Sequence, residues 1–245
     1  GGGSFWAHLP HAKNFLLVAA MIFVGSVQYA LFQSNLLFAL EYVFRLTNRG
    51  RYMFLLSVAS IATLPAWFLL MKHTRKMVAF FPAVLCTAVL YGAMALLPSP
   101  DGPDDSLTTI LVTAGILGIG CVDATWFIVN AIIPDTVEEF MRDSGSRDEG
   151  FLYSISLLAS KLGQGLGLSL SGYVLGQSGY EGSADVQNEI TLVAIRALAF
   201  GLPCLLLLAT TAIGLFVRDA RSSDLPSPSA NAEDDTTLPD SAKVE

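Results

Sequence analysis

Residues 151–177 read FLYSISLLASKLGQGLGLSLSGYVLGQ, and Lys161 is the only charged side chain in this stretch. At about 1.5 Å per residue, the stretch is long enough for a helix that crosses the roughly 30 Å hydrocarbon core of a bilayer. An ammonium group is costly in hydrocarbon, so a lysine in such a helix indicates function and requires a partner. The stretch therefore predicts a membrane-spanning helix that carries a functional charge.

The composition of the whole chain indicates an integral membrane protein. Of its 245 residues, 53% are apolar and 14% are charged, and its mean hydropathy is +0.55. This is too apolar for an ordinary soluble domain, and the long apolar segments favour helices over barrel strands. The predicted fold class is an all-α membrane protein with six transmembrane helices, at about 15–40, 53–71, 77–97, 107–133, 150–177 and 190–217.

The lysines and arginines outside the predicted spans indicate the orientation. Nine lie on the side of the two termini, whereas only Arg45, Arg49 and Arg51 lie on the other side. By the positive-inside rule, we expect a multi-pass protein with both termini in the cytoplasm. We expect the plasma membrane before an organelle membrane. Membrane lipid is an expected partner, and the net charge of -7 argues against nucleic acid.

The two ends of the chain differ from the six-span domain at 5–217. The first four residues, GGGS, resemble a flexible linker, and no initiator methionine precedes them. We therefore expect either a fragment of a longer protein or an engineered chain in which these four residues are a linker. The tail at 218–245 is rich in Ser, Pro and Asp without an apolar face, which predicts a disordered acidic cytoplasmic segment.

No enzyme site can be assembled from the sequence. Cys86, Cys121 and Cys204 fall within predicted spans, which indicates packing residues rather than disulfides or metal ligands. The three histidines complete no Ser-His-Asp or Cys-His arrangement within the membrane. We therefore expect no enzyme activity, no metal and no cofactor, apart from a coupling Na+ or H+.

Polar residues concentrate in the first, fourth and fifth spans. The candidate substrate or coupling residues are Gln28 and Asn35 in the first, Asp123, Trp126 and Asn130 in the fourth, and Lys161 and Gln164 in the fifth. Polar residues seven positions apart share a helix face. Polar helices beside apolar ones are the pattern of a transporter half around a water-filled cavity. Trp126 is the weakest candidate, because a packing role is commoner for a buried aromatic.

Asp123 is the leading candidate partner of Lys161. A short loop, predicted to be cytoplasmic, joins their spans, and each residue lies about 16 Å from it at about 1.5 Å per residue. Pairing would lower the cost of holding either charge away from water. The pair is either a fixed structural ion pair or part of a site where the lysine binds an anionic or polyhydroxylated solute. We favour the second, because intramembrane charges often mark substrate pathways.

Small residues form a stripe along the helix that carries Lys161. They are Ser156, Ser160, Gly163, Gly167 and Ser171. Their spacing of three or four places them on one face, which predicts close approach of another helix. Static packing and a sliding surface both fit this pattern.

Residues 131–154, AIIPDTVEEFMRDSGSRDEGFLYS, precede a lysine-bearing, glycine-rich helix that reads SGY at 171–173. This combination resembles the carboxy-terminal half of the cation-coupled glycoside, pentoside and hexuronide symporters, a branch of the major facilitator superfamily. The loop match rests on Asp135, Gly145, Arg147, Glu149 and Gly150, and the helix match on Lys161. The segment WFLLMKHTRKM at 67–77 departs from the family's usual glycine-plus-basic turn.

The resemblance implies a fold of two six-helix halves, with this chain as one half and the amino-terminal half as its partner. It implies that the cation site lies mainly in the amino-terminal half. As in melibiose permeases and animal sodium-dependent lysophospholipid symporters, Lys161 would serve coupling or headgroup binding. The resemblance also implies cytoplasmic gate contacts by Asp135, Arg142, Arg147 and Glu149. A solvated connector fits this charged loop equally well, because exposed ion pairs contribute only about 0–1 kcal/mol.

Three functions follow from these observations. We favour cation-coupled symport of a small solute, a sugar or glycoside first, by alternating access. A lysophospholipid symporter of the same family is the second. A six-span oligomeric channel or a non-transporting membrane scaffold is the third, although the sequence contains no recognisable filter motif that would form a pore.

Overall fold

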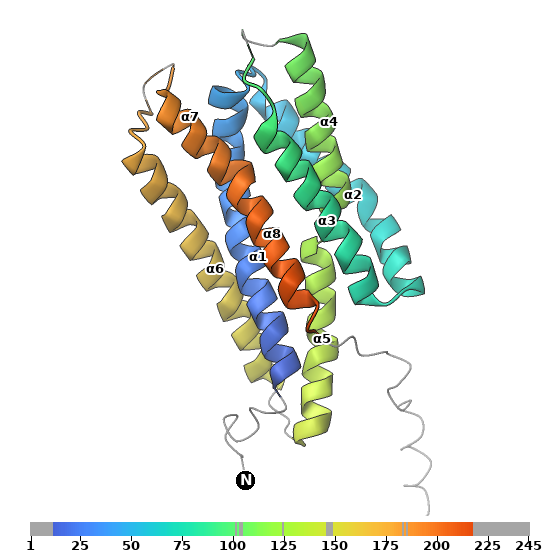
Figure 1. Ribbon diagram of the computed structural model, residues 1–245. Helices are drawn as coiled ribbons and strands as arrows, with labels where there is room; N and C mark the ends of the chain where they lie inside the picture. Colours follow the sequence, from blue (N-terminus) through green and yellow to red (C-terminus); the bar gives the residue numbers. More distant parts are fainter. Residues whose placement is uncertain are drawn as a thin grey trace, which may run out of the picture.

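The computed structural model describes residues 12–100, 102, 105–123, 125–145, 149–182, 184 and 186–217. These residues form helices and short connections, without a strand. The helices line up as six rods that run alternately up and down (Figure 1). The predicted linker at 1–4 and the predicted tail at 218–245 lie outside the described residues.

Three of the rods are single helices, and three contain a break or a wide turn. The helices are α1 (Lys13–Phe38), which continues into the π-helical turn η2 (Ala39–Val43), α2 (Arg49–His73), α3 (Lys76–Leu96), α4 (Ser106–Val122), α5 (Thr125–Ser144), α6 (Glu149–Gln177), α7 (Glu189–Arg196), the π-helical turn η3 (Ala197–Gly201) and α8 (Leu202–Gly214). Helices α4 and α5 form the fourth rod, and α7, η3 and α8 form the sixth.

The fourth rod differs from the predicted single span at 107–133. It is interrupted at Asp123, and α5 then continues through Pro134 to Ser144. Much of the predicted cytoplasmic loop is therefore helical. The reason is an amphipathic pattern, because Ile133, Val137 and Phe140 are buried at helical spacing between the charged residues that suggested a loop.

Five stretches of the described residues have the length and composition to cross a membrane. They are Lys13–Val43, Arg49–His73, Lys76–Leu96, Ser106–Ser144 and Glu189–Gly214. Helix α6 is absent from this set because its serines, Gln164 and Lys161 lower its hydropathy. Its 29 residues span about 43 Å, which is ample length for a bilayer.

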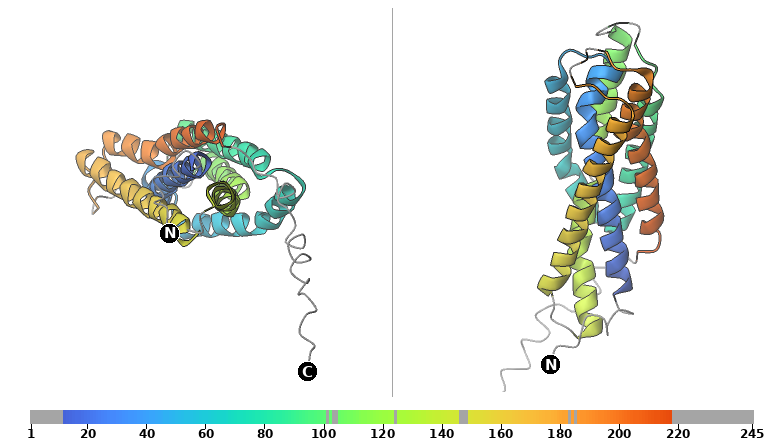
Figure 2. Two further views of the ribbon diagram at one scale, coloured as in Figure 1. Left: turned by 90° about the horizontal axis from the view of Figure 1, so that it is seen from below. Right: turned by 90° about the vertical axis from the view of Figure 1, so that its left-hand side faces the viewer.

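Helix α1 is central to the packing. It packs along α6 and α8 and also contacts α5, while α2 packs against α4 and α3 against α8 and α4. In the view along the bundle, α1 and the rod formed by α4 and α5 lie between the other helices (Figure 2). A buried aromatic cluster joins α1, α3 and η3, with ring centroids of Phe32 and Tyr91 4.8 Å apart and those of Phe32 and Phe200 6.3 Å apart.

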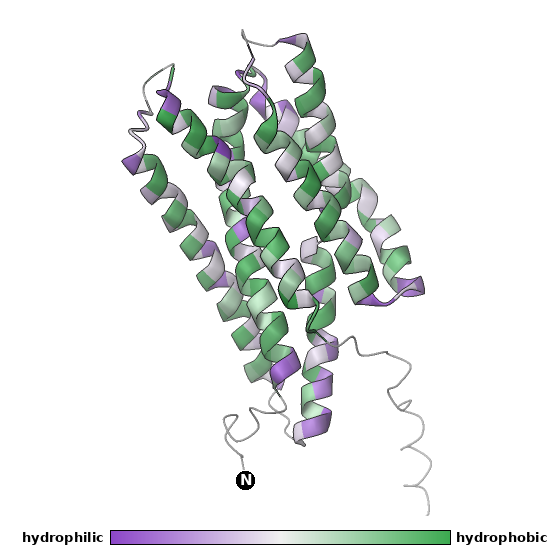
Figure 3. Ribbon diagram, viewed as in Figure 1, coloured by the Kyte–Doolittle hydropathy of each residue, from purple (hydrophilic) through white to green (hydrophobic). Residues whose placement is uncertain are grey.

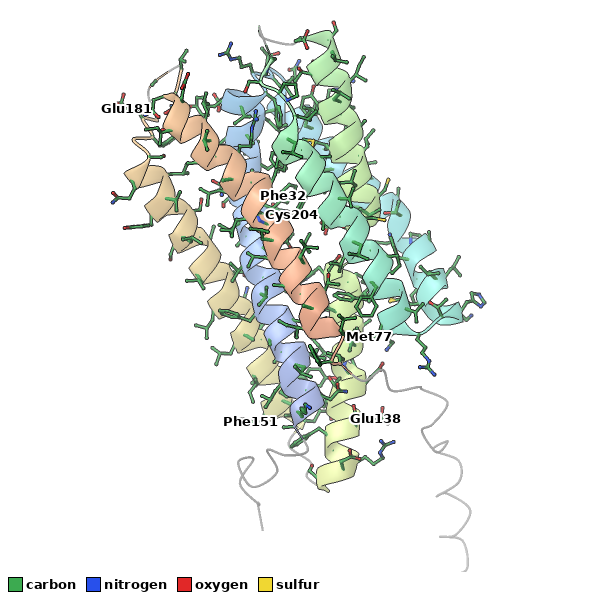
Figure 4. The ribbon with its side chains drawn as sticks, in the orientation of Figure 1. Phe32, Met77, Glu138, Phe151, Glu181 and Cys204 are labelled. Carbon is green, nitrogen blue, oxygen red and sulfur yellow. The ribbon has the colours of Figure 1, made fainter. Side chains whose placement is uncertain are left out.

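Charged residues gather toward the two ends of the bundle. The hydropathy colouring places most hydrophilic residues there and apolar residues along the middle (Figure 3). Glu181 lies at one end, Glu138 and Phe151 lie near the other, and Phe32 and Cys204 lie between them (Figure 4). The apolar middle carries exposed side chains such as Phe54, Ile61 and Val89, as expected of a surface that contacts lipid.

Candidate functional site

Lys161 projects from the side of α6 that does not contact α1. Its side chain is exposed, and its Nζ donates a hydrogen bond of 3.4 Å to Oε1 of Gln164, one turn along the helix. Lys161 forms no ion pair with any described residue. Lys161 and Gln164 therefore form a polar patch on a helix face that otherwise exposes leucines.

The opposite side of α6 is the small-residue stripe, and it packs on α1. Ser156, Ser160, Gly163, Gly167 and Ser171 are all buried. The Ser26 and Ser160 hydroxyls are 3.3 Å apart, and Ser171 donates a hydrogen bond of 3.0 Å to Oδ1 of Asn35. The stripe thus brings the two helices into close contact and turns Lys161 away from α1.

Asp123 lies at the interruption between α4 and α5. Its backbone N–H still donates to the Ile119 carbonyl at 2.8 Å, but its ψ of 46° leaves the helical region. Its side chain is partly buried. The Val122 carbonyl, immediately before it in the chain, accepts a hydrogen bond of 3.3 Å from Thr87 Oγ1 of α3, which places the interruption beside α3.

The predicted ion pair between Asp123 and Lys161 is not formed in this conformation. The ion pairs among the described residues join Arg49 with Glu41, Lys76 with Asp135, and Arg142 with Asp143. The reason is the packing order, because α6 packs chiefly on α1 whereas α4 packs on α2 and α3. Equal depth along the bundle did not bring the two side chains together.

Trp126 and Asn130 lie on α5, close to Asp123 in the chain. The Trp126 ring stacks on Tyr29 of α1, with centroids 6.2 Å apart and planes at 16°. The Tyr29 hydroxyl accepts a hydrogen bond of 2.8 Å from Gln33 Nε2. Asn130 is exposed, and its Nδ2 donates to the Trp126 carbonyl at 2.7 Å. Tyr29, Gln33, Trp126 and Asn130 form a second polar cluster, between α1 and α5.

Gln28 and Asn35 are buried between helices rather than on an open face. Gln28 Nε2 donates a hydrogen bond of 3.2 Å to the Tyr91 hydroxyl of α3. Asn35 Nδ2 donates to the Leu31 carbonyl at 2.8 Å, and its Oδ1 accepts from Ser171. Their expected place beside Lys161 in one cavity is not seen in this conformation. Both amides instead hold α1 to its neighbours.

Asp135 has a defined partner toward the end of the bundle where α1 begins and α8 ends. Lys76, the first residue of α3, donates from Nζ to both carboxylate oxygens of Asp135 at 2.7 and 2.8 Å and to the Ala131 carbonyl at 2.8 Å. The three hydrogen bonds of the Lys76 ammonium group therefore all go to acceptors within one stretch of α5. This contact fastens α3 to the part of α5 that extends past Pro134.

The other predicted gate residues make fewer contacts. Arg142 is exposed, and its one ion pair with a described residue is with its neighbour Asp143, at 3.4 Å. Glu149 lies in the first turn of α6. Arg147 lies outside the described residues. Of the four gate candidates, only Asp135 joins separate helices in the described part of the chain.

Two residues of these clusters were not selected from the sequence. Lys76 counted only toward the orientation of the chain, because nothing in the sequence indicated which carboxylate lay opposite it. Tyr29 lies four positions before Gln33, on the same helix face. This spacing was the feature of the sequence that could have indicated a contact between the two side chains. Among the described residues, no group of three or more His, Cys, Asp or Glu side chains lies close enough to hold a metal ion.

Comparison with known proteins gives consistent matches. The family model described as MFS/sugar transport protein matches residues 5–218. An uncharacterized symporter of Synechocystis sp. is 31% identical over 163 residues, which cover 64% of this chain and 29% of that protein. A glucuronide carrier protein homolog of Escherichia coli is 35% identical over 99 residues, which cover 40% of this chain and 21% of that protein. The aligned part of the chain spans less than a third of the length of either relative.

Proposed function

We propose that this chain, which belongs to the family of MFS/sugar transport proteins, is the carboxy-terminal half of a secondary active transporter. In this proposal the complete protein carries a small solute together with a cation by alternating access. The amino-terminal half supplies the other wall of the cavity. The short coverage of both relatives supports a chain that is part of a longer transporter.

The exposed ammonium of Lys161 is the observation that carries this proposal. On insertion scales, a lysine at the centre of a membrane helix costs about 2.5–3.5 kcal/mol when it faces lipid. The described residues offer Lys161 only the Gln164 amide and no carboxylate. A face with this charge is therefore better suited to a water-filled cavity between two halves than to lipid. An ammonium beside an amide can bind an anionic or hydroxyl-rich solute.

A sugar or glycoside is the solute class that we favour. Hydrogen-bonding groups and stacking aromatic rings both suit a sugar, and the cluster of Tyr29, Gln33, Trp126 and Asn130 supplies both. The name of the Escherichia coli relative, a glucuronide carrier protein homolog, supports a sugar with a carboxylate. In this reading Lys161 binds the carboxylate, and the cluster on α1 and α5 binds the sugar ring.

A lysophospholipid is the second candidate solute, and one observation favours it. Lys161 is surrounded on α6 by the exposed side chains of Leu157, Leu158, Leu162 and Leu168. A cationic group among alkyl side chains suits a phosphate headgroup with an acyl chain. A lysophospholipid has a much larger apolar surface than a glycoside. We therefore expect the protein to transport one class and not the other, which a transport assay can show.

Counterflow in proteoliposomes that contain the complete protein tests the proposal. Vesicles are loaded with a neutral glycoside, a glucuronide or a lysophospholipid, and exchange of the labelled solute is followed with and without Na+ or pH gradients. We expect saturable exchange of one class and accumulation that depends on one cation gradient. Unsaturable downhill flux of every solute would favour a channel, and absence of flux in folded protein would favour a scaffold.

A further inference from the structure

Within the described part of the chain, Asp123 is a carboxylate without a protein partner, at the break between α4 and α5. Its side chain is partly buried, and no described residue donates a hydrogen bond to it or forms an ion pair with it. An uncompensated carboxylate inside a membrane protein is costly unless it is protonated or neutralised by a cation. Because Lys161 does not pair with it here, another positive charge is required.

The helix break itself is held in place by side chains from neighbouring helices. The Cys121 carbonyl accepts a hydrogen bond of 2.9 Å from Trp67 Nε1 of α2, and the Val122 carbonyl accepts one of 3.3 Å from Thr87 Oγ1 of α3. These bonds satisfy backbone groups that the end of α4 would otherwise leave exposed. The end of a helix carries partial negative charge, which adds to that of Asp123 and favours a cation.

Thr125 provides an independent observation at the same break. It is the first residue of α5, it is 9% exposed, and its Oγ1 has no hydrogen-bond partner among the described residues. Buried hydroxyls are rarely left without a partner. A carboxylate and a hydroxyl two positions apart supply the hard oxygen ligands that alkali cations prefer.

The charge of the cation follows from the number of carboxylates. Among the described residues, no three carboxylate, His or Cys groups gather into a site for a multivalent metal. One carboxylate neutralises one positive charge. Discontinuous membrane helices are also a recurring place for coupling ions in transporters, because unwound backbone and carboxylates meet there.

We propose that Asp123 and Thr125 bind a single monovalent cation, either a proton or Na+, at the break between α4 and α5. This inference rests on the proposed transport function, for which the cation would supply coupling. It places a coupling site in the carboxy-terminal half, in addition to the site that the resemblance implies for the amino-terminal half. Trp126 follows Thr125 in the chain and stacks on Tyr29, so it can report on occupancy.

The test uses fluorescence of the purified complete protein without solute. The signal of Trp126 is obtained as the difference between the wild type and Trp126→Phe. It is recorded while NaCl replaces choline chloride at constant ionic strength, and in a separate series while pH is varied in choline chloride. A saturable response to Na+ assigns Na+, whereas a response to pH that Na+ does not alter assigns a proton.

We expect Asp123→Asn to abolish the response. Loss of the hydroxyl in Thr125→Val should weaken the apparent affinity by about tenfold, as expected for one hydrogen-bonding oxygen on a charge. Thr125→Ser and Asp105→Asn should retain the response. If Asp123→Asn does not fold, the contrast between Thr125→Val and Thr125→Ser decides.

Two results would overturn the inference: an unchanged response in folded Asp123→Asn, or no response of the folded wild type to either cation. Because no solute is present, failure of solute transport is measured separately in counterflow. A fluorescence response to the cation without solute transport would count against the proposed function but would still support the cation site.

Discussion

Gly163 of α6 lies so close to the Phe23 carbonyl of α1 that a Cβ at Gly163 would meet that oxygen at 2.5 Å. A Cβ at Gly167 would meet the Val27 carbonyl at 2.8 Å. Side-chain carbons do not approach backbone oxygens this closely, so the two helices would have to separate. The contact between α1 and α6 therefore depends on glycine at these two positions, as in other close-packed membrane helices.

We expect Gly163→Ala to destabilise the complete protein. Added volume in a close-packed contact costs about 1–3 kcal/mol, which should lower the midpoint of thermal unfolding in detergent. Gly165→Ala is the matched control, because a Cβ at Gly165 meets nothing within 4 Å and alanine favours helix. The control should keep or raise the midpoint. Equal midpoints for the two variants would contradict the close contact.

Asp105 caps the start of α4 in a way that depends on pH. Its carboxylate accepts a hydrogen bond of 2.9 Å from the Thr108 N–H, and this bond lowers the pKa of Asp105. The pKa of Asp105 is thus lower in the folded protein than in the unfolded chain, where it is roughly 4. The cap therefore contributes its full stability at pH values above the unfolded-chain pKa. This contribution is lost as the pH falls through the pKa of Asp105 in the folded protein. We expect the first turn of α4 to lose protection in that acid range.

Hydrogen exchange followed by mass spectrometry can check this expectation on the peptide that contains Thr108. Rates are normalised to the intrinsic rate at each pH. Asp105→Asn keeps an acceptor oxygen but cannot titrate, so its protection should not change with pH in that range. A pH dependence in Asp105→Asn equal to that of the wild type would show that another group is responsible.

The sequence was sufficient to predict the family and five of the six helical rods, but not the form of the fourth. The MFS match confirms the resemblance that rested on the Asp135 loop and Lys161. The small-residue stripe was recognisable because three- and four-residue spacing fixes a helix face whatever the partner. The extension of α5 past Pro134 was missed because its charged residues resemble a loop, although Val137 and Phe140 keep the helical period.

The partners of the charged residues could not be predicted in the same way. The rise per residue fixes depth, and depth alone suggested that Asp123 and Lys161 meet. The direction of each side chain depends on which helix lies against which face, and α6 turns its serine and glycine face to α1. Lys76 and Asp135 are 59 positions apart, so only the packing of α3 on α5 reveals their ion pair.

Because Asp123 and Lys161 do not pair, their substitutions should act independently on stability. We expect the changes in unfolding free energy from Asp123→Asn and Lys161→Gln to add in the double variant within about 0.5 kcal/mol. Denaturant or thermal unfolding of the complete protein in detergent measures the three values. An interaction free energy above about 1 kcal/mol in this double-mutant cycle would show that the two side chains meet in the dominant state.

We expect Lys161→Ala to remove solute uptake without lowering stability. Of the residues that the structure describes, only Gln164 accepts a hydrogen bond from the exposed Lys161 side chain, so little folding energy depends on it. Loss of a direct substrate contact worth about 1.4 kcal/mol or more would reduce uptake at least about tenfold. Leu166→Ala, at a position of the same helix that is 51% exposed, is the control and should keep uptake. Full uptake by Lys161→Ala would show that Lys161 does not contribute to transport.

The contact of Lys76 with Asp135 should couple measurably, unlike the pair of Arg142 with Asp143. The Lys76 and Asp135 side chains are 31% and 27% exposed, and the lysine also bonds the Ala131 carbonyl. We expect Lys76→Met and Asp135→Asn each to cost about 1–2 kcal/mol and the double variant to cost less than their sum by about 1 kcal/mol. Arg142→Gln, whose partner is an exposed neighbour, should change stability by less than about 0.5 kcal/mol. Additive costs for Lys76→Met and Asp135→Asn would mean that the ion pair does not fasten α3 to α5 in solution.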